Sequence, residues 1–166
     1  MPTKTRNYRN PLLTGSRVPG NPNLTVFADQ HYHGLQAMED YGPYCEQHLS
    51  KLYQTIMLSL REHPQTLAIR FDLRLPSYIE NADEFYHNGM IASFFKKLRE
   101  KVEDNRKSAK EKNSKAHRSS LRYVWCREST DSKPHWHCVI FVNKHAYRGL
   151  GKTDPNSDNM RNRIRE

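Results

Sequence analysis

Cysteine is scarce in this chain, and its spacing excludes the folds that depend on it. Three cysteines occur in 166 residues, at Cys45, Cys126 and Cys138, and no two of them form a Cys-x-x-Cys pair. An odd number at such spacing argues against a disulfide framework and against a cysteine-rich zinc module. We therefore expect reduced thiols. If the segments around Cys126 and Cys138 pair, the two thiols could lie near each other, so a metal-binding role for one of them stays open.

Long apolar runs are also missing. No stretch approaches the roughly 18 consecutive apolar residues of a membrane-spanning helix. The first residues, Met1-Pro2-Thr3-Lys4, do not begin a signal peptide with an apolar core. We expect a soluble protein of the cytoplasm with no membrane partner.

Acidic residues are outnumbered by basic ones. The chain has 27 Lys and Arg against 18 Asp and Glu, which gives a formal net charge of +9 at pH 7. Such an excess favours a polyanionic partner. Nucleic acid is the first candidate and an anionic membrane the second, and the lack of apolar runs weakens the second.

Residues 1–40 are polar and repeatedly broken by proline and glycine, which predicts a flexible basic arm before a domain at 41–166. His31-Tyr32-His33 lies among these turn formers, so we expect a loop there and no metal site. In the domain, apolar residues at three- and four-residue steps predict an amphipathic helix over 43–61.

A strand and a second helix follow. Strict alternation of apolar and polar residues predicts the strand over 66–75. Asn81 or Asp83 is placed to cap the helix, whose apolar positions continue to about Asp104. Residues 105–118 are basic and polar without apolar anchors, which predicts a frayed helix end and a mobile basic loop.

The last part of the chain predicts a β-hairpin and a short helix. Residues 121–128 and 135–143 are rich in strand formers and are separated by turn-forming residues. A helix through Met160 and Ile164 then runs into the chain end and looks cut short. The predicted class is therefore α+β.

Two histidines at strand spacing are the candidate metal ligands. His135 and His137 project from one face of the strand, whereas Trp136 points to the other face and is expected in the core. Symmetric pairing of the hairpin would place Glu128 opposite His135 and Cys126 opposite His137. The predicted ligand set is Glu128, His135 and His137.

This mixed nitrogen and oxygen set suits Mn²⁺ or Mg²⁺, with Zn²⁺ as a weaker fit, and it leaves coordination positions open for water and a phosphate oxygen. The cation would act as a Lewis acid on that phosphate. The alternative is that the histidines are solvent-facing polar residues of an amphipathic sheet.

The run from Glu128 through Pro134-His-Trp-His-Cys-Val-Ile-Phe-Val-Asn143 resembles the hairpin of rolling-circle replication initiator (Rep) proteins of the HUH endonuclease superfamily. With Ile69-Arg-Phe-Asp-Leu-Arg-Leu75 upstream, it is similar to the Rep-like proteins of filamentous phages and prophages, over about residues 43–166. The resemblance implies a ferredoxin-like βαββαβ antiparallel sheet with helices on one face. It also implies a divalent metal on Glu128, His135 and His137, while Asp72 matches a first-strand position of uncertain role, with pairing to Arg70 or Arg74 as the alternative.

The nucleophile of that family has no clear counterpart here. The resemblance implies a tyrosine that attacks DNA and forms a 5′-phosphotyrosine, on a helix well downstream of the hairpin. Tyr147 is the sole tyrosine after the hairpin, in a loop without the family's motif, and is a weak substitute. The closing strand of the fold is missing as well. We expect either a domain truncated at its C-terminus, as part of a longer polypeptide, or a natural short variant.

Basic residues offer contacts to DNA phosphates, whose affinity falls steeply with salt. The alternative for such a charge run is a solvated helix face with a floppy loop. The candidates are Arg70, Arg74, Lys96, Lys97, Lys107, Lys110, Lys112, Lys115 and Arg118.

The leading hypothesis is a bacterial, phage or mobile-element nickase. It would bind single-stranded or hairpin origin DNA, start rolling-circle replication with host replication proteins, and cleave by metal-assisted tyrosine transesterification. The first rival is a non-catalytic DNA-binding regulator of the same fold. The second is a nucleic-acid-binding or protein-interaction domain with a structural zinc site that includes Cys126.

Overall fold

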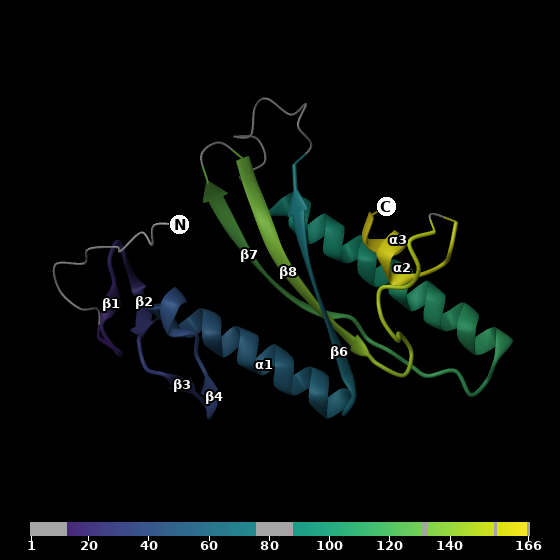
Figure 1. Ribbon diagram of the computed structural model, residues 1–166, viewed down its shortest axis with the longest axis horizontal. Coiled ribbons are helices and arrows are strands. Elements are labelled where there is room, and N and C mark those ends of the chain that lie inside the picture. Colours follow the sequence, from purple (N-terminus) through teal and green to yellow (C-terminus); the bar gives the residue numbers. More distant parts are fainter. Residues whose placement is uncertain (1–12, 76–87, 131–132, 155, 166) are drawn as a thin grey trace. The chain divides into compact units, whose positions relative to one another are not determined.

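The computed structural model describes residues 13–75, 88–130, 133–154 and 156–165. The chain divides into an N-terminal unit, residues 1–54, and a C-terminal unit, residues 55–166, each of which is compact (Figure 1). The predicted helix cap, Asn81 or Asp83, lies outside the described residues. No helix in the described ranges is long and apolar enough to cross a membrane.

Short antiparallel strands build the described part of the N-terminal unit. β1 (Arg17–Val18), β2 (Asn21–Phe27) and β5 (Tyr44–Cys45) form a sheet in the order β1-β2-β5. A two-stranded hairpin is formed by β3 (His31–Tyr32) and β4 (Leu35–Gln36), and the 3-10 helix η1 (Glu39–Tyr41) follows it.

Residues 1–12 of the flexible arm expected over residues 1–40 lie outside the described residues, and residues 13–40 contain these short strands. Val26 and Phe27 are buried at the end of β2, so the strand has apolar packing of its own. Gly20 lies at a φ of 81°, which glycine adopts freely, and it turns the chain from β1 into β2. The turn formers therefore separate short strands, and the loop expected at His31-Tyr32-His33 is in fact part of a β-hairpin.

The first predicted helix is confirmed as α1 (Glu46–Glu62). It ends just before His63-Pro64, because proline disfavours helical backbone in the residue that precedes it. Glu62 forms an ion pair with Arg122 at 2.7 Å, and the His63 ring accepts a hydrogen bond of 3.2 Å from the Ser120 backbone N–H. These contacts fix the end of α1 to the chain entering the central sheet.

Three antiparallel strands form that sheet. They are β6 (Thr66–Arg74), β7 (Arg122–Thr130) and β8 (Lys133–Asn143), in the order β6-β8-β7 (Figure 1). The predicted register of the hairpin is confirmed: Glu128 pairs with His135, and Cys126 pairs with His137. On its other side β8 pairs with β6, which sets Asp72 opposite His137.

One face of this sheet packs against α2 (Gly89–Lys112). Phe95, Leu98 and Val102 of the helix are at most 1% exposed, and Trp136 of β8, predicted to face the core, is 2% exposed. The ring of Phe95 stacks on Tyr123 of β7 with centroids 3.7 Å apart. The short predicted helix is confirmed as α3 (Met160–Arg165), with Met160 in the same core.

The end of α2 corrects the prediction of a frayed helix and mobile loop over residues 105–118. The helix continues through residue 112, and only the segment after it is non-helical. Lysine, arginine, glutamate and alanine are good helix formers, so no apolar anchor is needed to extend it. Lys110 and Lys112 in the last turn also interact favourably with the helix dipole.

The C-terminal unit thus has an α+β fold with the element order β6-α2-β7-β8-α3. α2 and α3 contribute to the same hydrophobic core. Within the described residues, no fourth strand lies beside β6.

Candidate metal centre

Two histidines and a glutamate meet on the sheet face that points away from α2. The Oε2 atom of Glu128 lies 3.2 Å from His135 Nε2 and 3.2 Å from His137 Nε2. One ligand atom from each of the three residues lies within 4.8 Å of the others. The structure therefore brings together all three ligands predicted from the sequence.

The hairpin register places these side chains. Trp136 lies between the two histidines in sequence and is buried on the α2 side, so both imidazoles must project from the opposite face. A slip of one residue would expose Trp136 and turn the histidines into the core. Burial of one indole ring thus selects the face on which the ligands gather.

Asp72 is a further neighbour of this cluster, and the pairing of β6 with β8 places it beside His137. Its Oδ1 accepts a hydrogen bond of 2.7 Å from Nδ1 of His137. With its proton on Nδ1, a neutral His137 presents the Nε2 lone pair toward Glu128, as a metal-binding histidine does. Strand alternation placed Asp72 on a charged face, but only tertiary pairing brings it to His137.

The same contacts perturb two ionisable groups. Hydrogen bonds to Asp72 and then Glu128 raise the pKa of His137 above its ordinary value. The hydrogen bond from His137 holds the pKa of the Asp72 carboxyl below its ordinary value, and Arg70 and Arg74 contribute in the same direction. The cluster therefore stabilises positive charge at the ring of His137.

The donor set fits a divalent cation. Ligand atoms on opposite sides of an ion bound at about 2.1 Å are separated by roughly 4 Å, so this cluster needs little closure to hold one. Two imidazole nitrogens and a carboxylate oxygen leave further coordination positions open, which is typical of a catalytic rather than a closed structural site.

The cysteines do not complete a zinc site. Cys126 shares the histidine face but is not a member of the compact cluster, and desolvation raises the pKa of its thiol, which disfavours the thiolate. Cys138 is fully buried on the α2 side, and burial raises its pKa to about 12. This geometry argues against the closed site in which Cys126 would be a ligand.

Two arginines border the cluster on the same sheet face. Arg74 pairs in register with His135, and Arg70 lies two residues before Asp72 on β6. Both are exposed. Cationic side chains beside a metal site are suited to an anionic ligand such as a phosphodiester.

The other predicted DNA contacts lie elsewhere. Lys96 and Lys97 belong to the first half of α2 and Lys107, Lys110 and Lys112 to its second half, while Lys115 and Arg118 follow the helix. Because α2 covers the face opposite the histidines, these residues are not part of the metal centre.

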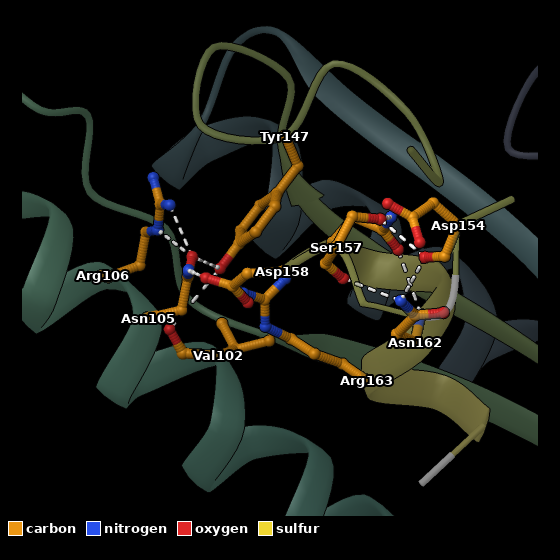
Figure 2. A network of polar contacts seen from close by, with 10 residues as sticks. Val102, Asn105, Arg106, Tyr147, Asp154, Ser157, Asp158, Asn162 and Arg163 are labelled. Atoms are coloured by element: carbon orange, nitrogen blue, oxygen red, sulfur yellow. Dashed lines mark hydrogen bonds and ion pairs between the residues drawn. The ribbon is translucent and has the colours of Figure 1, made fainter. Parts of the chain in front are cut away.

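Tyr147, the weak candidate nucleophile, is not brought to the histidines. It follows the far end of β8, and Asn143 at that end is about 20 Å along the strand from His137. Tyr147 is 6% exposed, and its hydroxyl donates to Asn105 Oδ1 of α2 at 3.1 Å (Figure 2). Burial raises the pKa of Tyr147. We therefore assign Tyr147 to the packing of α2 and not to chemistry at the cluster.

The comparisons with known proteins give a family. The family model of the YagK/YfjJ C-terminal domain matches residues 27–166. The chain is 28% identical over 130 residues to the uncharacterized protein YagK of Escherichia coli (strain K12), covering 75% of this chain and 62% of that protein. It is 31% identical over 133 residues to the uncharacterized protein YfjJ of the same organism, covering 75% of this chain and 64% of that protein.

The chain thus spans less than two thirds of the length of these two relatives. No solved structure matches it.

Proposed function

This chain belongs to the YagK/YfjJ C-terminal domain family, and from the chemistry of its site we propose that it is an HUH-type DNA-nicking domain that binds a divalent cation. Its partner is single-stranded or hairpin origin DNA, in a bacterial cytoplasm that supplies host replication proteins. A phage or another mobile element is the kind of genome that would encode it.

The observation that carries this proposal is the cluster of Glu128, His135 and His137 with Asp72 behind it. Solvent-facing histidines of an ordinary amphipathic sheet would need neither a shared carboxylate nor a second one on the remote ring nitrogen. A carboxylate that orients a histidine from behind is a recurring feature of metal sites. The three ligands would hold Mn²⁺ or Mg²⁺, with Zn²⁺ a weaker fit.

Each residue has a defined task in the proposed reaction. A bound divalent cation supplies Lewis-acid polarisation of the scissile phosphate. Asp72 fixes the proton of His137 on Nδ1, and Arg70 and Arg74 attract the phosphates on either side. A tyrosine hydroxyl loses its proton, and its oxygen forms a bond to phosphorus while the bond from phosphorus to the 3′ oxygen breaks; the 3′ oxygen takes up a proton, which leaves a 5′-phosphotyrosine and a free 3′ hydroxyl. That tyrosine is not Tyr147, so it comes from another part of the polypeptide.

Calorimetric titration of Mn²⁺ into the chain tests the metal centre. We expect one bound Mn²⁺ per chain, and loss of binding in His135→Ala and in His137→Ala, because each removes a ligand. His145→Ala is the matched control and should bind as the wild type does. Unchanged Mn²⁺ binding in both ligand variants would refute the site.

Cleavage of a labelled single-stranded origin oligonucleotide with Mn²⁺ tests the nicking activity, in a chain extended through the reading frame if it continues beyond residue 166. A covalent adduct that resists denaturant is the expected product.

A non-catalytic DNA-binding regulator of the same fold is the second candidate. It is favoured by the position of the tyrosines: in the described part of the C-terminal unit, Tyr123 and Tyr147 both contact α2 and not the histidine cluster. Binding of origin DNA without an adduct in the extended chain would favour this candidate. One tightly bound zinc ion with no coordination position open to an exchangeable ligand would instead favour a structural zinc site.

A further inference from the structure

The second half of α2 and the segment that follows it enclose an open groove that the sequence did not reveal. Its volume is about 440 Å³. Its charged walls come from Glu103, Arg106, Lys107, Lys110, Glu111 and Arg118. Four cations against two carboxylates give the groove a positive charge, which favours an anionic occupant.

The cationic side chains available to an occupant come from two different elements. Lys107 and Lys110 are three residues apart on α2 and therefore point to the same side of the helix. Arg118 faces them from the segment beyond the helix. All three are exposed, and among the described residues none has an acidic side chain within 4.0 Å.

Helix stability alone does not explain this arrangement. Lysines near a helix C-terminus offset the helix dipole, and spacing of four residues from glutamates supports the helix weakly. The helix dipole accounts for Lys110 in the last turn, and the four-residue spacing from Glu103 and Glu111 accounts for Lys107. Neither accounts for Arg118, which lies outside α2.

The wall that carries Arg118 is held in place. Asn143 Nδ2 donates to the Arg118 backbone oxygen at 2.7 Å, and Asn143 N–H donates to Ser119 Oγ at 2.9 Å. Arg106 Nη1 donates to the His117 backbone oxygen at 3.4 Å, across the groove. The groove is thus preformed, so an occupant need not order this segment.

We infer that this groove binds the phosphodiester backbone of DNA at a second point, separate from the metal centre. The inference rests on the proposed function, since it takes DNA as the ligand. Arg118 is anchored at Asn143, which lies about 20 Å along β8 from His137. At about 3.4 Å per phosphate in a duplex strand, this separation corresponds to roughly six nucleotides. The groove would therefore hold DNA flanking the reacting phosphate.

Fluorescence anisotropy with two labelled single-stranded oligonucleotides, of about three and about twenty nucleotides, tests the inference in the presence of Mn²⁺, because an extended single strand spans more distance per nucleotide than a duplex strand. The groove variant is the triple charge reversal Lys107→Glu, Lys110→Glu and Arg118→Glu. Its matched control reverses three other exposed cations of the same unit: Arg148→Glu, Lys152→Glu and Arg165→Glu. Circular dichroism verifies that both variants are folded.

We expect the groove variant to bind the long oligonucleotide at least about tenfold more weakly at 0.1 M salt, and the salt dependence to lose about two units of slope. Its affinity for the short oligonucleotide should stay within about threefold of the control triple, because that ligand reaches one site at a time. Equal losses in both triples, or none in either, would overturn the inference in favour of general surface charge.

The failure of this inference is distinguishable from failure of the proposed function. If the wild-type chain binds no Mn²⁺, but the groove variant binds the long oligonucleotide more weakly than the wild type does, the groove is supported and the metal centre is refuted. If the wild-type chain binds Mn²⁺ and the groove variant binds both oligonucleotides as the wild type does, the metal centre is supported and the groove is refuted. A chain that binds neither oligonucleotide rejects both.

Discussion

His137 is the residue on which the contacts of the metal centre converge. One ring nitrogen faces Asp72 and the other faces Glu128, so a single side chain links β6, β7 and β8. The face on which it lies is set by the adjacent buried Trp136, and its Nδ1 atom lies 2.7 Å from Asp72 Oδ1. Residues that orient a ligand in this way can be tested separately from the ligands themselves.

Asp72→Asn should weaken Mn²⁺ affinity by about 10- to 100-fold without abolishing it, because an oriented ligand is retained but its charged partner is lost. Calorimetric titration measures the change. Asp104→Asn, the same substitution at an exposed position on α2, is the control and should leave Mn²⁺ affinity unchanged. Equal affinities in Asp72→Asn and the wild type would remove Asp72 from the centre.

The thiol of Cys138 should not be alkylated in the folded protein at pH 8. It is fully buried, and its pKa is raised to about 12, so little reactive thiolate is present. Mass spectrometry of the modified peptides should show exposed Cys126 labelled in the native state and Cys138 labelled only in denaturant. Similar rates at Cys138 with and without denaturant would contradict the assigned packing of β8.

At the scale of the elements, α2 is joined to the C-terminal residues by a polar network. Tyr147 donates to Asn105, and Asn105 Nδ2 donates to Asp158, which in turn contacts Arg163 of α3 (Figure 2). The guanidinium carbon of Arg106 lies 4.6 Å from the centre of the Tyr147 ring. This network anchors α2 beyond Val102, the last buried apolar residue of the helix.

Tyr147→Phe should lower the free energy of unfolding by about 1 kcal/mol, because Asn105 loses a hydrogen-bond donor. Urea unfolding measures the change, with Tyr41→Phe, at a 71% exposed position, as the control that should have no effect. Burial raises the folded-state pKa of Tyr147 above 10.0, so its contribution is complete below pH 10 and is lost as pH rises through the folded value. The difference from Tyr147→Phe should therefore shrink in that alkaline range. A difference that grew there would reverse the assigned direction of the pKa shift.

Ser108→Pro tests whether α2 continues beyond residue 104. Within a helix, proline removes a hydrogen bond and clashes with the preceding turn, so we expect a loss of about 3 kcal/mol in urea unfolding. Ser114→Pro is the control. It lies beyond the helix, and Asn113 before it is extended at φ −148° and ψ 108°, which tolerates a following proline. Comparable small losses of stability in both variants would support the mobile loop predicted over residues 105–118.

At the scale of the whole molecule, charge is distributed over two separate places that suit DNA. Arg70 and Arg74 flank the histidine cluster, whereas the groove lies at the second half of α2. The formal net charge of +9 supports both.

DNA affinity of the wild-type chain should fall at least about tenfold between 50 and 200 mM salt, because bound phosphates release counterions. Anisotropy titrations at several salt concentrations measure this. The double variant His135→Ala, His137→Ala should keep the same salt dependence, since it removes metal ligands and no lysine or arginine. An affinity insensitive to salt would exclude the backbone contacts proposed for both places.

Periodicity and register were predictable from the sequence because they follow from local rules. The alternation around Trp136 selected the ligand face, and the symmetric hairpin set Glu128 opposite His135. The apolar stripe of α1 and its stop at Pro64 were equally local. These rules hold wherever one strand face or helix stripe is buried.

Contacts between segments distant in sequence were decided only by tertiary structure. Asp72 meets His137 across 65 positions because β6 pairs with β8, and Arg118 reaches the groove because Asn143 holds its segment. Tyr147 is drawn into the core by α2 and away from the histidines. The sequence by itself determined which side chains could bind a metal or a phosphate. Strand pairing and helix packing decided which of them lie close enough to act together, because those distances depend on burial shared by several elements.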